Sequence, residues 1–179
     1  MALSKIDGTN FIEGTLPDTN INNASLDNVT GLPAAIATGK VLQVVSAVLG
    51  TSSNTTSTSD SDTGLNANIT PSSTSNKILV KVSHNGVIKY TGASNLGVKL
   101  KLFRDSTELD VLSAEAAWNN VSQYSDVGSV SNDYLDSPNT TSEINYKTKI
   151  ACANVSGTSV GINNGSSLST IVLMEIKGW

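Results

Sequence analysis

Two segments of the chain alternate between apolar and polar residues. In residues 77–83 every second side chain is apolar, and lysine or serine occupies most positions between. Residues 98–104 repeat this pattern, with Lys99 and Lys101 between their apolar positions. A period of two is typical of a strand that has one buried and one solvated face. These segments therefore predict two half-buried strands.

The last segment, residues 167–179, contains the longest nearly unbroken apolar run in the chain. A run of about eight apolar residues is too short to cross a bilayer as a helix. Its isoleucine and valine content, and the serine, threonine, asparagine and glycine residues before it, favour a buried strand. We therefore expect a central strand of a β-sheet that is apolar on both faces.

The two faces of this last strand have different expected partners. One face includes Val172 and Met174, and the other includes Ile171 and Leu173. One face can pack against the opposite sheet, but the second has no obvious partner in so polar a chain. We assign Ile171 and Leu173 to a subunit interface, together with Phe103, because such a chain gains stability by burying strand faces between subunits.

The remaining patterns are shorter. Residues 40–49 and 145–151 are expected to be strands, residues 113–118 a helical turn, and residues 119–141 mostly loop. His84 precedes Asn85-Gly86 and is expected to lie in a turn. Seven to nine short strands separated by turn residues predict an all-β protein, an antiparallel β-sandwich of jelly-roll type.

Three aromatic residues, Trp118, Tyr124 and Tyr134, fall in or beside the least regular region. Aromatic side chains on loops of a rigid sandwich are candidate receptor contacts. The alternative is that they fill gaps in the core or between subunits, as large aromatic residues commonly do. The sequence leaves both interpretations open.

Charge is sparse and scattered. Charged residues make up 15% of the chain and the formal net charge is −4, against about 25% charged residues in ordinary soluble domains. Lysine and arginine occur singly, which argues against a nucleic-acid surface. The single cysteine, Cys152, allows no intrachain disulfide. No basic segment followed by an apolar one opens the chain, so we expect neither a secretory signal nor membrane insertion.

Candidate chemical sites are weak. The only histidine, His84, lacks the strand-to-helix context of a nucleophile elbow in this all-β pattern. Residues 60–64 resemble the start of a calcium-binding loop, but Pro71 stands where the closing glutamate should be. One histidine and one cysteine cannot make an ordinary zinc site. We therefore expect no catalytic residue, no cofactor and no metal site, and the chain is not expected to be an enzyme.

Residues 1–39 differ from the rest. Apolar residues recur there every three to five positions between proline, glycine, asparagine and aspartate, which are poor helix formers. Such a segment cannot bury a core alone. We expect it to act as an extended arm that lies against another surface through isolated apolar anchors, and residues 40–179 to form the sandwich. The expected anchors are Leu16, Ile21, Leu26, Val29 and Leu32.

The segments Gly14-Thr15-Leu16-Pro17 and Ala24-Ser25-Leu26-Asp27-Asn28-Val29-Thr30-Gly31-Leu32-Pro33 resemble the N-terminal arms of phage tail-fibre and related virion proteins. Residues 71–82 and 169–176 look like paired strands of the small β-sandwich knobs of phage fibres and capsid-decoration proteins.

The resemblance implies a virion structural protein assembled in the host cytoplasm. It implies a homotrimeric short tail fibre whose arm binds other virion proteins and whose tip binds a host surface glycan or protein. A capsid-decoration (cement) protein is the first alternative, and a carbohydrate-active hydrolase module on the same sandwich is a weaker one.

Overall fold

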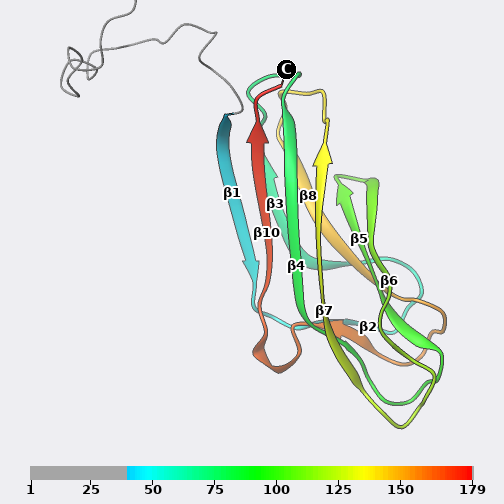
Figure 1. The fold of residues 1–179 in the computed structure, drawn as a ribbon. Coiled ribbons are helices and arrows are strands. Elements are labelled where there is room, and N and C mark those ends of the chain that lie inside the picture. Colours follow the sequence, from blue (N-terminus) through cyan, green and yellow to red (C-terminus); the bar gives the residue numbers. More distant parts are fainter. Residues whose placement is uncertain (1–39, 179) are drawn as a thin grey trace, which may run out of the picture. The chain divides into compact units, whose positions relative to one another are not determined.

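The computed structural model describes residues 40–178 of the chain, and this part is almost entirely β-structure (Figure 1). Ten strands follow one another, with one short 3₁₀ turn, η4 (Asn164–Ser166), before the last of them. The strands are β1 (Val41–Leu49), β2 (Ser53–Thr55), β3 (Ser61–Ile69), β4 (Lys77–Lys89), β5 (Leu96–Arg104), β6 (Thr107–Asn119), β7 (Asp126–Asp136), β8 (Ile144–Cys152), β9 (Val160–Ile162) and β10 (Ser169–Ile176). No helix in this described part is long and apolar enough to cross a membrane.

The strands form two antiparallel sheets. The first contains β1, β10, β4 and β7 in that order, and the short β9 and β2 extend it beyond the far part of β4. The second has the order β3-β8-β5-β6. The chain crosses between sheets at each step along its long strands except from β5 to β6. Eight strands in this order make a jelly roll, so the predicted fold class is confirmed.

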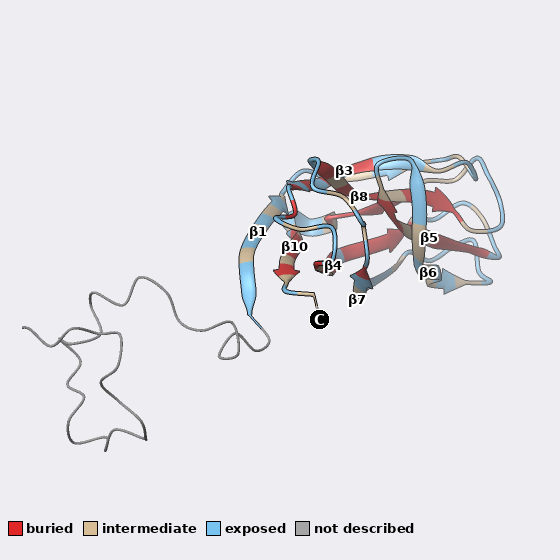
Figure 2. Cartoon of the chain, turned by 90° about the horizontal axis from the view of Figure 1, so that it is seen from above, coloured by how far each residue is buried: buried red, intermediate tan, exposed pale blue. Residues whose placement is uncertain are grey.

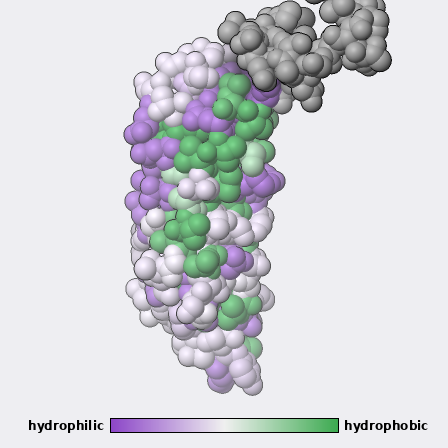
Figure 3. Space-filling model, turned by 90° about the vertical axis from the view of Figure 1, so that its left-hand side faces the viewer, coloured by the Kyte–Doolittle hydropathy of each residue, from purple (hydrophilic) through white to green (hydrophobic). Residues whose placement is uncertain are grey.

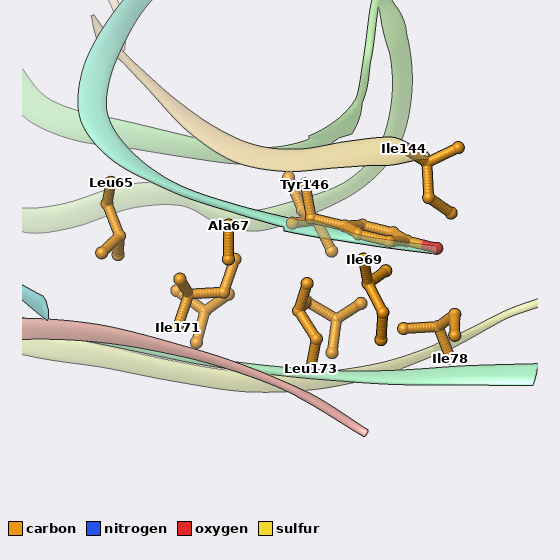
Figure 4. Close-up of a cluster of buried hydrophobic side chains, with 11 residues drawn as sticks. Leu65, Ala67, Ile69, Ile78, Ile144, Tyr146, Ile171 and Leu173 are labelled. Atoms are coloured by element: carbon orange, nitrogen blue, oxygen red, sulfur yellow. The ribbon is translucent and has the colours of Figure 1, made fainter. Parts of the chain in front are cut away.

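The core lies between the sheets, whose inner faces are buried (Figure 2). Around Leu173, side chains of β10 and β4 meet those of β3 and β8, and Tyr146 lies across the gap (Figure 4). A second cluster around Leu100 and Ile162 fills the other end of the sandwich. In β3, β8 and β10 the buried residues of these clusters alternate with exposed or partly exposed ones, as a period of two requires.

The final strand turns the opposite face inward from the one predicted. Ile171 and Leu173 have no exposed surface and pack in the chain's own core, whereas Val172 and Met174 point outward and are partly exposed. Ile171 and Leu173 therefore cannot form the surface of a subunit interface. Phe103 is also only 7% exposed, because Lys149 Nζ covers its ring at 4.6 Å from the centroid.

Hydrogen bonds to Glu175 account for the inward orientation of the face that carries Ile171 and Leu173. Glu175 shares the inner face with Leu173, and its carboxylate is 1% exposed. It accepts hydrogen bonds from Gln43 Nε2 (2.6 Å), Asn76 Nδ2 (2.6 Å) and the Ser72 amide (2.7 Å) and hydroxyl (2.8 Å). Burial raises the pKa of Glu175, but these hydrogen bonds outweigh it and hold the pKa below its usual value. A buried carboxylate is tolerated because it is fully paired.

Three local predictions were wrong. Residues 113–118 are part of β6 and not a helical turn, and β7 occupies the middle of the segment expected to be loop. β4 does not end at His84 but continues to Lys89 through a bulge between His84 and Val87. Gly86 makes this possible: its φ is +56°, and a Cβ there would lie 2.6 Å from the Asn164 backbone.

The core position of Leu173 gives the first testable prediction. Leu173→Ala should lower the free energy of unfolding by about 2–5 kcal/mol, because it opens a cavity in a fully packed region. The matched control is Leu168→Ala, since Leu168 lies just before β10 and is 53% exposed; it should cost less than about 1 kcal/mol. Urea unfolding of both variants measures the difference, and equal losses would contradict the assignment of Leu173 to the core.

Candidate functional site

The only histidine is part of a buried polar cluster near the bulge of β4. His84 Nδ1 lies 3.1 Å from Ser169 Oγ, and Ser169 Oγ donates to Asn163 Oδ1 at 2.6 Å. Because the Ser169 proton is committed to Asn163, its oxygen accepts from Nδ1–H of a neutral His84. His84 Nε2 has no hydrogen-bond partner in the described residues.

This arrangement places a serine beside a histidine but in the wrong chemical relation for nucleophilic catalysis. An activating base accepts the serine proton, whereas here His84 donates to Ser169. Both side chains are also fully buried, so no substrate reaches them. The sequence prediction of a turn residue missed this cluster, because nothing local signals that Ser169 lies opposite His84.

Asn163 makes the cluster a structural junction. Its Nδ2 donates to the carbonyl oxygens of Leu49 and Thr51, both at 2.9 Å, and its own amide donates to Asn85 O at 2.9 Å. It adopts a left-handed backbone conformation with φ of 60°, which asparagine tolerates. Through its side chain and its backbone amide, this one residue links the end of β1, the bulge of β4 and the start of β10.

The carboxylates of the calcium-like segment face lysines on the outer face of the second sheet. Asp60 lies 2.9 Å from Lys101 Nζ, and Asp62 lies 3.4 Å from Lys147 Nζ and 3.8 Å from Lys149 Nζ. Within residues 40–178, no group of three or more histidine, cysteine, aspartate or glutamate side chains is placed to hold a metal ion.

The loops at the end of the sandwich opposite residue 40 carry two of the predicted contact residues (Figure 1). Trp118 is 45% exposed at the end of β6, and Tyr124 is 67% exposed in the β6–β7 loop. Tyr134 differs, because it is partly buried and packs against the core from β7. The structure therefore brings Trp118 and Tyr124 to one end and separates Tyr134 from them.

A buried lysine holds the loop that carries Tyr124. Lys89 has no exposed surface, and its Nζ donates to Asn119 Oδ1 (2.7 Å), Val121 O (2.7 Å) and Tyr124 O (3.1 Å). A buried ammonium group needs such partners, so the contacts also fix the path of the loop. The local sequence around Lys89 does not indicate this role, because the acceptors lie 30 to 35 positions away.

The predicted anchors Leu16, Ile21, Leu26, Val29 and Leu32 lie outside the described residues, so their role stays a prediction. The division between residues 1–39 and 40–179 also stays a prediction.

The buried histidine predicts a pH dependence of stability. Burial lowers the pKa of His84 from 6.5 to about 4, so on acidification the unfolded chain takes up a proton before the folded chain does. The stability associated with neutral His84 is complete above pH 6.5 and is lost as the pH falls toward 4. Between pH 7 and pH 5 the free energy of unfolding should fall by about 2 kcal/mol.

Chemical unfolding at a series of pH values measures this slope. The chain has one histidine, so His84→Gln should remove most of the slope between pH 7 and pH 5 even if the variant is less stable throughout. An unchanged slope in the variant would contradict the assignment to His84.

No protein-family model matches the chain, and no curated protein matches it at a significant level. Among solved structures, a chain in the structure of infectious bursal disease virus Gx strain is similar to this one. The alignment covers 76% of this chain and 36% of the viral chain, with 11% identity and a TM-score of 0.43. The VP2 subviral particle of the same virus aligns over 76% and 40%, with 8% identity and a TM-score of 0.38. The chain thus spans well under two thirds of these proteins.

Proposed function

We propose that the chain is a structural protein of a phage particle, a short tail fibre whose jelly-roll knob presents a host-binding tip. The observation that carries the proposal is the arrangement of the knob. The described chain begins at one end of a jelly roll, and loops with exposed aromatic side chains lie at the other. Jelly rolls recur in viral capsid and lectin domains, which supports both parts of the proposal.

Attachment is assigned to residues 1–39. Their resemblance to fibre arms and their isolated apolar residues favour binding to other virion proteins along an extended path. Residue 40 leads directly into β1, and β1 runs from this end of the sandwich toward the loop end. An attached arm would therefore leave the loop end facing away from the attachment point.

Binding of the host is assigned to the loop end. Tyr124 and Trp118 offer large amphipathic surfaces there, and the Lys89 contacts fix the loop before binding. A fixed loop loses little conformational entropy when it binds. The ligand class is a surface glycan or protein, for which exposed aromatic residues are common anchors.

A capsid-decoration protein is the second candidate, because an arm joined to a jelly-roll knob suits attachment to a capsid as well as to a tail. The resemblance of residues 1–39 to fibre arms favours the fibre. The two differ in where the protein sits on the particle, which electron cryomicroscopy measures directly.

Deleting residues 1–33 tests the arm. We expect a knob that is folded, with a cooperative thermal melt, and that is missing from purified particles when mass spectrometry and electron cryomicroscopy are used to find it. The full-length chain should appear at the tail. A position on the capsid face would exclude the fibre, and a truncated chain that fails to fold would exclude the division at residues 39 and 40.

Replacing Tyr124 tests the tip. Tyr124→Ala should weaken binding of the fluorescently labelled protein to host cells at least about tenfold, the effect expected of a central aromatic contact. Val111→Ala is the matched control, since Val111 is 43% exposed on β6 and lies away from the β6–β7 loop. If both variants bind like the wild type, Tyr124 is not a receptor contact.

A further inference from the structure

The outer face of the sheet β1-β10-β4-β7 carries an apolar row. The strand register aligns Val44, Met174, Leu79 and Leu135 across the four strands. All four lie on the strand faces turned away from the core, and Val44 and Leu135 are 57% and 52% exposed. Toward residue 40, Val41 and Ile176 continue the row along β1 and β10. Figure 3, seen from the β1 side, shows hydrophobic surface gathered there.

The same face becomes polar away from residue 40. The following rows are Ser46, Val172, Lys81 and Asp133, and then Val48, Thr170, Ser83 and Ser131. A shallow open depression lies over these polar rows. The apolar band, defined as Val41, Val44, Leu79, Leu135, Met174 and Ile176, is therefore confined to the end of the face near residue 40.

The charges on the two sheets decide which face can be covered by another molecule. On the outer face of the second sheet, Lys101 pairs with Asp60 and Glu108, and Lys147 and Lys149 face Asp62. Covering those charges costs desolvation energy. On the first sheet, the carboxylate of Asp133 pairs with Lys81 at 2.5 Å, and one charged side chain, Lys77, stands in the rows of the apolar band, beside Ile176, where its Nζ donates to Ser137 Oγ at 2.8 Å. A second copy that covers this end of the first sheet therefore desolvates fewer charged groups than one that covers the outer face of the second sheet.

We propose that the apolar band is the surface through which copies of this chain associate side by side, with their strands parallel. The face is large enough for this contact. Four strands of eight or nine residues cover roughly 28 by 19 Å, a projected area of about 500 Å². The accessible area is larger, because side chains stand out from the sheet. This is of the order of the ~800 Å² that each partner contributes to a standard interface.

The position of the band fixes the direction of packing. In a parallel assembly the apolar rows of neighbouring copies meet at the same height along the strands. An antiparallel pair with full overlap would place the two apolar rows against the rows of Lys81 with Asp133 and of Thr170 with Ser131, which leaves apolar surface unmatched. Parallel packing also gathers the residue-40 ends of all copies, and this consequence rests on the proposed function, in which residues 1–39 attach to one place on the particle.

The test uses the full-length chain. Light scattering after size exclusion should give an oligomer for the wild type and the mass of one chain, 18.5 kDa, for Met174→Asp. Thr170→Asp is the matched control on the same strand and the same face, and it should stay oligomeric. Leu135→Asp, on β7, is a second band variant that should also be monomeric, and it replaces Met174→Asp if that variant fails to fold. A monomeric wild type, or oligomers in both band variants, would overturn the inference.

Spin labels at Lys40→Cys test the direction, because Cys152 is buried and does not label in the folded protein. In a parallel oligomer the labels lie at the same height, whereas antiparallel packing separates them by about 30 Å more along the strands. Such a long separation would overturn the parallel arrangement. If the protein is a monomer but is found on particles, this inference fails and the proposed function stands. If it is an oligomer but is missing from particles, the proposed function fails and this inference stands.

Discussion

The structure depends on the insertion of the last strand between the first and the fourth. β10 is the only long-strand partner of β1, and it also pairs with β4 along its whole length. Removing it would leave β1 unpaired and open the core around Leu173. The pairing of β10 with β1 joins residues more than a hundred positions apart. It therefore forms only when most of the chain is in place, which is the reason that proteins dominated by such pairings fold slowly.

Four buried polar side chains, in three groups, hold the points where this sheet meets its loops. Glu175 ties β10 to β1 and to the segment after β3, His84 and Ser169 join β4 to the start of β10, and Lys89 fixes the β6–β7 loop. Each costs desolvation energy, and each but His84 has its polar atoms paired. The unpaired His84 Nε2 makes the cluster sensitive to acid, whereas the paired Lys89 makes the loop end rigid.

The two sheets divide the surface of the knob by chemistry. The outer face of β3-β8-β5-β6 carries ion-paired lysines that suit contact with water, and the outer face of β1-β10-β4-β7 carries an apolar band at one end. The aromatic residues at the loop end form a third region. The proposed self-association uses the apolar band and the proposed host binding uses the loop end, whereas the proposed attachment uses residues 1–39.

The sequence by itself determined the fold class and which residues share a strand face. A period of two in residues 77–83 and 98–104 requires half-buried strands, and many short strands between turn residues require a sandwich. It also named Trp118, Tyr124 and Tyr134 as candidate receptor contacts, and this role stays a prediction. Alternation says nothing, however, about which face of a strand is turned inward when both are apolar.

Only the tertiary structure decided which face of β10 is turned toward the core. Leu173 shares its face with a carboxylate, and that face is buried because Gln43, Ser72 and Asn76, distant in sequence, supply hydrogen bonds to Glu175. The same holds for His84, whose partner Ser169 lies 85 positions away. It holds also for Lys89, whose hydrogen-bond acceptors lie at the end of β6 and in the β6–β7 loop. Hydrogen bonds between strands that are adjacent only in space override local propensity, and no local pattern records them.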